Sequence, residues 1–161
     1  MSQFRVEKRR AEAQLTLSTG VSLRGSFFLA ASTPTQIGPE RVADLLNAEA
    51  GFFPFGPSGG SDQDTVLVNR AHVISVKLLE RVDEAKVDPG YEVATERHVV
   101  MLLSNGTRLT GSVRAFCPQG HDRLSDYIRS PPTFRYLECA ETTFIVNTAH
   151  IVEVKESYSR V

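Results

Sequence analysis

The chain has 161 residues, of which 41% are hydrophobic, enough for one ordinary domain or two very small ones. Its 18 Lys and Arg balance 19 Asp and Glu, so no global positive charge draws in nucleic acid or anionic lipid. No apolar run approaches the ~20 residues of a membrane span, and the N-terminal residues lack the apolar core of a secretory signal. We therefore expect a cytoplasmic protein with no membrane partner.

The first predicted elements are two strands around the turn at residues 18–20. In the second strand, apolar residues alternate with polar ones from Val21 to Leu29, which is typical of a strand with one buried face. A short helix is predicted next, because Val42, Leu45 and Leu46 stand at i, i+3 and i+4 and form one apolar stripe. The chain then returns through an aromatic strand at residues 51–55 and closes with two strands joined by a tight turn.

Three blocks of this half recur further on in the same order. Residues 65–77 ("TVLVNRAHVISVK") and 143–155 ("TFIVNTAHIVEVK") share seven of thirteen positions, at an offset of 78 (143 minus 65). Residues 17–27 match 103–113 at an offset of 86, and 41–47 match 123–129 at an offset of 82. The second helix has the same apolar stripe, at Leu124, Tyr127 and Ile128. Three collinear blocks indicate tandem duplication.

The duplication predicts the domains and the fold class. We expect a first barrel repeat at residues 1–80, a charged linker at 81–97 and a second barrel repeat at 98–161. Gly25 and Gly111 fall on the buried phase at the same place in each copy, where glycine marks a sharp bend or a close backbone approach. We therefore predict a mainly β fold of two tandem small SH3/Sm-like β-barrels, each with one short helix, packed as a pseudo-twofold pair.

The pattern "VVMLLSNGTRLTGSV" (residues 99–113), a helix, an aromatic strand and "TTFIVNTAHIVEV" (142–154) resembles SH3-like barrels of the Sm/Lsm type. More narrowly, "RLSDYIR" (123–129), "TFRYLECA" and "FIVNTAHIVEV" resemble an uncharacterised bacterial family with an R-L-S-D-Y-L-N phrase and a final N-K-x-H-I phrase. The resemblance covers most of residues 98–156 and, more weakly, 13–79, and it implies a small barrel in a bacterial protein. The glycine of the last turn in Sm proteins is absent here, and a helix interrupts strands that Sm proteins join directly. Both differences lie where Sm proteins bind RNA, so RNA is not the partner we expect.

Asn69 and Asn147 stand three places before His72 and His150. In so tight a connection, an Asn side chain can bond the backbone two residues on and accept left-handed geometry, while the His caps the turn or packs on the next strand. The alternative is that His72 and His150 meet across the interface between the copies as a metal pair or a pH-sensitive contact. Two His without a carboxylate or thiol at ligand spacing make a poor metal site, so we favour the structural turn.

Phe52, Phe53 and Phe55 have two interpretations. They fill the barrel, or they form a docking or dimerisation surface. Pro54 cannot donate a ladder hydrogen bond, which predicts that this strand is an edge or ends early. Three Phe on an edge strand would form a docking or dimerisation surface, and both interpretations stay open.

The sequence contains no motif for catalysis, metal binding or a disulfide framework. The two cysteines, Cys117 and Cys139, are too few for a disulfide framework or a four-ligand zinc site, and we interpret them as reduced, partly buried packing residues. No nucleophile elbow, phosphate-cradling Gly loop, paired carboxylate motif or metal signature occurs, so we expect no enzyme, no metal and no cofactor.

We predict a non-catalytic protein-interaction or regulatory adaptor, with another protein as partner and a homo-oligomer left open. The alternative is an Sm-like binder of single-stranded RNA, for which Arg24, Arg70, Arg108 and Arg114 would line the strand faces. A second alternative is a small-ligand sensor, which requires an enclosed pocket between the repeats.

Overall fold

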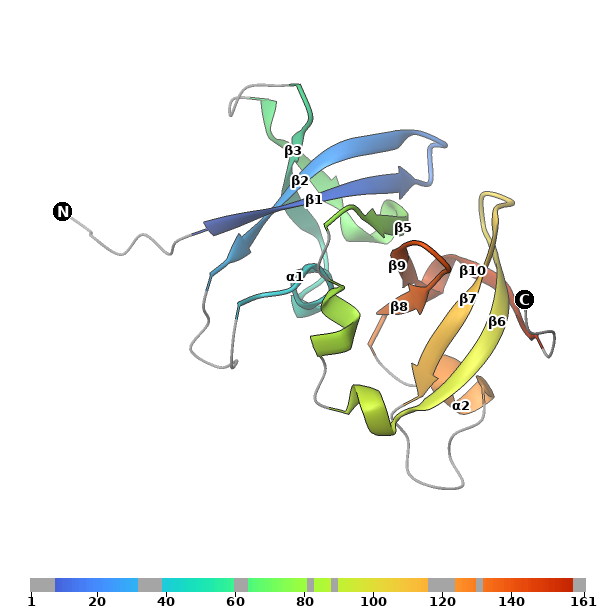
Figure 1. The fold of residues 1–161 in the computed structure, drawn as a ribbon. Coiled ribbons are helices and arrows are strands. Elements are labelled where there is room, and N and C mark those ends of the chain that lie inside the picture. The colour runs from blue at the N-terminus through green and yellow to red at the C-terminus, as the bar shows by residue number, and fades with distance from the viewer. Residues whose placement is uncertain are drawn as a thin grey trace.

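The protein is described by a computed structural model that covers residues 8–31, 39–59, 64–80, 83–87, 90–115, 124–129 and 132–157. These residues are mainly β, as predicted, and form one antiparallel sheet with short helices at its sides (Figure 1). No helix among them is long and apolar enough to cross a membrane.

Both halves of the chain contain the same elements in the same order. The first half consists of β1 (Lys8–Leu17), β2 (Ser22–Ala30), α1 (Val42–Ala48), β3 (Phe52–Pro57), β4 (Val66–Asn69), the 3-10 helix η2 (Arg70–His72) and β5 (Val73–Leu78). The second half consists of β6 (Thr95–Leu103), β7 (Arg108–Ala115), α2 (Leu124–Arg129), β8 (Phe134–Glu138), β9 (Thr143–Asn147), η5 (Thr148–His150) and β10 (Ile151–Glu156). The predicted order of two strands, a helix and three strands is confirmed in each half.

The strands form a single sheet with the order β10-β6-β7-β8-β9-β5-β1-β2-β3-β4. Within each half, the last strand lies beside the first. The halves meet where β5 pairs antiparallel with β9, in the middle of the molecule between the two long hairpins (Figure 1). One continuous sheet that is not closed therefore takes the place of the two separate closed barrels that we expected.

The halves are joined head to tail. A twofold axis would place the same strand of each half at the junction. Instead, β5 is the fifth strand of its half and β9 is the fourth strand of the other. The prediction of a pseudo-twofold pair is therefore wrong, and β4 and β10 lie at the two ends of the sheet.

The core divides into two clusters. The first contains Phe27, which stacks on Phe53 at a centroid distance of 5.4 Å and meets Phe55 edge-on at 5.3 Å. The buried residues of α1 face this cluster and Tyr127 of α2 faces the other, which confirms the two apolar helical stripes. Each cluster also takes residues from the opposite half: Phe134 and Ile145 enter the first, and Ile74 enters the second.

Gly25 and Gly111 allow neighbouring strands to approach closely. A Cβ on Gly25 would lie 2.2 Å from the carbonyl oxygen of Gly56 on β3, and one on Gly111 would lie 2.6 Å from that of Glu138 on β8. Since no side chain fits in that space, the prediction of a close backbone approach at both positions is confirmed.

The segment at residues 81–97, which we expected to be a linker, carries the 3-10 helices η3 (Glu84–Val87) and η4 (Tyr91–Val93), and β6 begins within it. Cys139, just beyond β8, is a free, half-buried thiol whose pKa is raised by burial, as expected of a packing residue. Cys117 lies outside the described residues.

Candidate interaction site

The repeated phrase of the sequence builds the junction between the halves. Across it, Ser75 lies opposite Val146, Val76 opposite Ile145 and Lys77 opposite Phe144. Val76 and Ile145 are fully buried at its centre. The junction therefore combines a ladder of backbone pairs with an apolar contact.

Asn69 and Asn147 end β4 and β9, and each holds the turn that follows it. The Asn69 Oδ1 accepts the amide hydrogen of Ala71 at 3.0 Å, and the Asn147 Oδ1 accepts that of Ala149 at 3.0 Å. The predicted bond to the backbone two residues on is therefore confirmed. The left-handed geometry is not, because φ is −79° at both asparagines.

Asn147 also bonds across the junction, whereas Asn69 does not. The Asn147 Nδ2 donates to the carbonyl oxygens of Val73 at 3.0 Å and Arg70 at 3.4 Å, both in the first half. The Asn69 Nδ2 has no acceptor among the described residues. The same side chain thus holds two strands together at one position and lies at an open edge at the other.

The two histidines differ in the same way. Each Nδ1 lies beside a hairpin serine, Ser18 Oγ at 2.7 Å from His72 and Ser104 Oγ at 2.8 Å from His150. The His150 Nε2 lies 2.8 Å from the carbonyl oxygen of Ala71, so this nitrogen carries the proton and donates across the junction. That bond occupies the nitrogen that a metal pair would need. Within the part of the chain that the structure describes, no cluster of three or more His, Cys, Asp or Glu side chains could hold a metal ion.

The three phenylalanines do not form one surface. Phe53 and Phe55 are buried in the first core cluster, while Phe52, on the other face of β3, is 61% exposed. β3 is not an edge strand, because it lies between β2 and β4. Its pairing with β2 ends at Phe55, just before Pro54, so only the prediction of an early end is correct.

The edge strands expose apolar side chains that the sequence analysis did not single out. Leu67 on β4 is 69% exposed and Val152 on β10 is 64% exposed. Phe52 pairs with Asn69 and Pro54 with Leu67, so Phe52 and Leu67 share one face beside the β4 edge. The counterpart of Leu67 at the 78-residue offset, Ile145, is fully buried, and a Leu in place of an Ile gives no sign of this difference in exposure.

The four arginines of the nucleic-acid alternative are dispersed. Arg70 is buried, and its guanidinium donates to the carbonyl oxygens of Phe52 at 2.9 Å and Leu45 at 3.0 Å. Arg114 pairs with Glu96 at 3.0 Å and with Glu138 at 3.5 Å. Arg24 and Arg108 are exposed, on β2 and β7.

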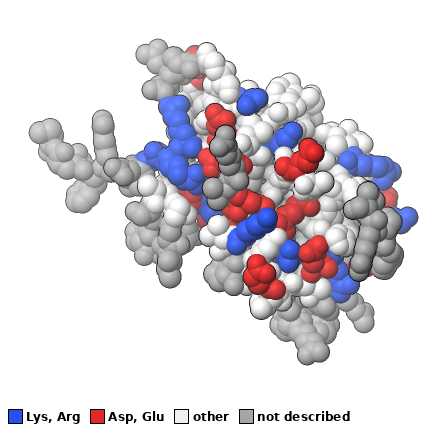
Figure 2. Space-filling view, viewed as in Figure 1, with Lys and Arg blue, Asp and Glu red and all other residues white. Residues whose placement is uncertain are grey.

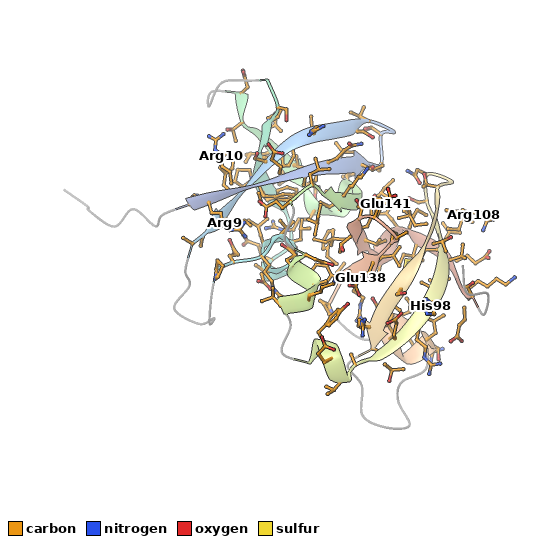
Figure 3. The ribbon with its side chains drawn as sticks, viewed as in Figure 1. Arg9, Arg10, His98, Arg108, Glu138 and Glu141 are labelled. Carbon is orange, nitrogen blue, oxygen red and sulfur yellow. The ribbon has the colours of Figure 1, made fainter. Side chains whose placement is uncertain are left out.

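The positions of these four arginines do not form a continuous basic surface. Figure 2 shows acidic side chains interspersed with basic ones over the half that contains β6 and β7. The basic side chains Arg9 and Arg10 on β1 lie on the opposite side of the view from Arg108 (Figure 3). This face offers a nucleic acid no unbroken row of positive charge.

A cavity of about 370 Å³ lies between the halves, bordered by α1, β8 and η4. Arg114 lies over the ring of Tyr91 at 4.0 Å, Arg135 over Tyr127 at 4.3 Å and Arg41 over Tyr136 at 5.9 Å, and all six residues line it. Burial raises the pKa of Tyr127, so its phenol stays protonated at neutral pH. Glu138 also lines the cavity and lies between the halves in Figure 3.

Beside this cavity, Glu84 of η3 joins the two halves. Its carboxylate accepts from the amides of Val42 at 3.0 Å and Ala43 at 3.1 Å in α1, and from the Tyr136 hydroxyl at 2.8 Å in β8. Burial raises the pKa of this carboxyl, although these hydrogen bonds and the charge of Arg41 lower it. Because its donors are backbone amides of α1 and a hydroxyl of β8, we interpret Glu84 as a residue that connects the two halves.

Comparison of the chain with protein-family models, curated proteins and solved structures finds no match. The resemblance to Sm/Lsm-type barrels and to a bacterial family, the bacterial origin and the cytoplasmic location therefore stay predictions.

Proposed function

We propose that the protein is a non-catalytic protein-interaction or regulatory adaptor that binds a protein partner by strand addition at the β4 edge. The observation that carries this proposal is the exposure of Leu67 and Val66 on a strand that has no neighbour on one side among the described residues. Natural edge strands are usually protected by charged residues, proline, bulges or a covering element. β4, with the sequence VLVN, contains neither a charge nor a proline.

The chemistry of this edge suits an extended segment. In strand addition, backbone hydrogen bonds supply affinity and alternate side chains supply specificity. Here the neighbouring face carries Phe52 beside Leu67, an apolar contact for the side chains of an added strand. The strand beside the edge, β3, is anchored in the core by Phe53 and Phe55.

The proposal includes the origin and the architecture of the two halves. The same order of elements and the same Asn–backbone bond in each half support tandem duplication of one small barrel-type unit. Each unit opens where it joins the next, so the duplicated chain forms a platform with one edge at either end. Such a platform could hold a partner strand without any catalytic group.

The test compares Leu67→Lys with Val21→Lys, an equally large change at another exposed apolar position, 54% exposed, in the β1–β2 hairpin. Tagged wild type and both variants are used to recover bound proteins from native cells at moderate salt. We expect a partner that binds the wild type and Val21→Lys and is lost with Leu67→Lys. A partner recovered equally with all three proteins would contradict binding at the β4 edge. Recovery of RNA with a steep salt dependence would favour the nucleic-acid alternative.

The cavity between the halves favours a second candidate function, the binding of a small ligand. Its volume of about 370 Å³ falls within the range of small-molecule sites, roughly 300–1,000 Å³. Three stacked Arg–Tyr pairs line it, and because Arg41 and Arg114 already pair with Asp44 and Glu138, a small anion with an apolar part would take the place of these carboxylates. A thermal-shift screen of small carboxylates and phosphates tests this: a compound that raises the melting temperature of the wild type and not of Arg135→Ala would support it.

A further inference from the structure

We propose that the partner of the β4 edge is strand β10 of a second copy of this chain. Chains would then join head to tail, through a repetition of the junction that already joins the two halves of each chain. This inference rests on the proposed strand addition at β4 and names its occupant.

The equivalence of the strands is the first step. Adding 78 to the residue numbers carries β4, η2 and β5 onto β9, η5 and β10. Within the chain, β5 pairs with β9. The counterparts of these two strands are β10 and β4, which are the two edges of the sheet. Each chain therefore contains one complete junction and both sides of an incomplete one.

Burial of the apolar residues is the second step. Ile145 is 0% exposed inside the junction and its counterpart Leu67 is 69% exposed; Ile74 is 1% exposed and its counterpart Val152 is 64% exposed. At the offset of 82, Phe134 is buried at 4% and its counterpart Phe52 is exposed at 61%. In every pair the member on or beside the junction strands is covered, and the member on or beside an edge strand is not. Pairing β4 with β10 would cover all three exposed side chains.

The polar groups give the third step. Asn147 and His150 donate to the carbonyl oxygens of Val73 and Ala71 across the junction. At the β4 edge, the counterparts Asn69 Nδ2 and His72 Nε2 have no acceptor among the residues that the structure describes. The carbonyl groups that correspond to those acceptors belong to Ile151 and Ala149, at the β10 end of the sheet. A second chain would therefore satisfy both donors.

The register follows from the internal junction. Transferring its three pairs by 78 residues places Glu153 opposite Val68, Val154 opposite Leu67 and Lys155 opposite Val66. β4 carries no charge, so neither Glu153 nor Lys155 meets a like charge there, although Glu153, in the place of Ser75, which is 5% exposed, would be covered without a cationic partner at some cost.

The junction between chains is weaker than the internal one. Asn47 both donates to and accepts from the backbone of Phe134, at 2.9 and 2.8 Å. The counterpart of Asn47 is Arg129, which cannot accept the amide hydrogen of Phe52. We therefore expect assembly to be reversible and dependent on protein concentration. A head-to-tail contact closes into a ring when its rotation allows, and otherwise extends as a filament.

The first experiment measures the mass of the full chain by light scattering over a range of concentrations. The wild type should exceed 17.8 kDa, the mass of one chain, and rise toward a multiple of it. Leu67→Arg should remain a monomer with an unchanged melting temperature, because Leu67 is exposed within one chain. Val21→Arg is the matched control and should assemble like the wild type.

A wild type that is monomeric at every concentration, or a Leu67→Arg variant that assembles as the wild type does, would overturn the inference. The first outcome would leave the proposed function intact if Leu67→Lys still lost a different protein partner in the recovery experiment. Failure of both experiments would remove both proposals.

The second experiment tests the register by disulfide formation, in a background that carries Cys117→Ser and Cys139→Ser. Val66→Cys combined with Lys155→Cys should link chains into a ladder of oligomers under mild oxidation. Val66→Cys combined with Glu153→Cys is the control, two residues out of register, where Cα atoms are too far apart for a disulfide. Equal linkage in both, or linkage of Val66→Cys alone, would show a different pairing and refute the proposed junction.

Discussion

Asn147 and Asn69 allow one substitution to be compared in two environments. Asp has the shape of Asn and keeps the oxygen that accepts the amide hydrogen two residues on, but it replaces the donor nitrogen by an acceptor oxygen. Asn147→Asp removes the donor that holds the junction, whereas Asn69→Asp changes a group that has no acceptor within the described chain. We expect the first change to destabilise the fold and the second to leave it nearly unaffected.

The magnitude follows from the contacts of Asn147. The side chain is 2% exposed, and its bond to Val73 is well within hydrogen-bonding distance at 3.0 Å, whereas the bond to Arg70, at 3.4 Å, is weak. Leaving one buried carbonyl unpaired costs about 1–3 kcal/mol, and burial of an ionised carboxylate beside it adds to this cost. We therefore expect Asn147→Asp to lower the free energy of unfolding by about 2–4 kcal/mol at neutral pH. For Asn69→Asp the expected change is within about 0.5 kcal/mol.

The loss should depend on pH. The introduced carboxyl at position 147 is buried and faces carbonyl oxygens, so its folded-state pKa lies above the unfolded value of about 3.9. Below that value the group is protonated in both states and its hydroxyl can donate to Val73, so the variant approaches the wild type. As the pH rises through 3.9 toward the folded-state pKa, the unfolded state ionises first and stability falls.

Urea unfolding followed by circular dichroism measures both variants, at concentrations where the chain is a monomer and at several pH values. Circular dichroism is suitable because the chain contains no Trp. Equal losses at the two positions, or a loss at Asn147→Asp that does not vary with pH, would refute the role of the Asn147 amide as the donor that holds the junction.

Three further predictions concern the fold. Gly25→Ala should cost roughly 1–3 kcal/mol, because its Cβ would lie 2.2 Å from the Gly56 oxygen; thermal unfolding beside Ser26→Ala as control checks this, and equal melting temperatures would contradict it. Glu84→Gln should flatten the decline in stability as the pH rises above the ordinary carboxyl pKa of 4.5, because a carboxyl whose folded-state pKa is raised destabilises the fold when it ionises; an unchanged slope would argue against burial as the cause. Arg70→Met should cost about 1–3 kcal/mol, since two backbone carbonyls lose their donor, and an unchanged urea midpoint would show that water replaces it.

Local features of the structure were readable from the sequence. The alternation in β2 and the apolar stripe of α1 depend on residues at most four positions apart, and both are found as predicted. The bond from each Asn to the backbone spans two residues, so its chemistry is visible in the phrase itself. Features of this kind require no knowledge of which distant segments meet.

The partner of β5 was not readable, because the pattern of a strand does not say which other edge it joins. A closed barrel would pair both edges of β5 within its own half, whereas in the structure one edge pairs with β1 of that half and the other edge joins β9 of the other half. One signal was present in the composition of β5. Residues Val73–Val76 are buried on both faces, while the corresponding part of β10 contains the exposed Glu153. A strand covered on both faces favours the inside of a larger sheet.

The candidate surface was only partly predicted, because the prediction did not assign the three phenylalanines to the two faces of their strand. Phe52 and Phe53 point to opposite faces of a strand, so the three phenylalanines could not all be exposed together. The identities between the two copies do not include Leu67. Its significance lies in a difference of environment from Ile145, which only coordinates reveal.

Phe134 and Ile145 complete the core of the opposite half, and Ile74 does the same in return. Unfolding should therefore be a single cooperative transition, although the amino-acid sequence consists of two similar halves. A protease that cut within residues 81–97 would leave a nicked but intact complex, since each fragment supplies side chains that the other needs. Expression of either piece alone would yield an incomplete interior, and a second piece supplied in trans would be required to fill it.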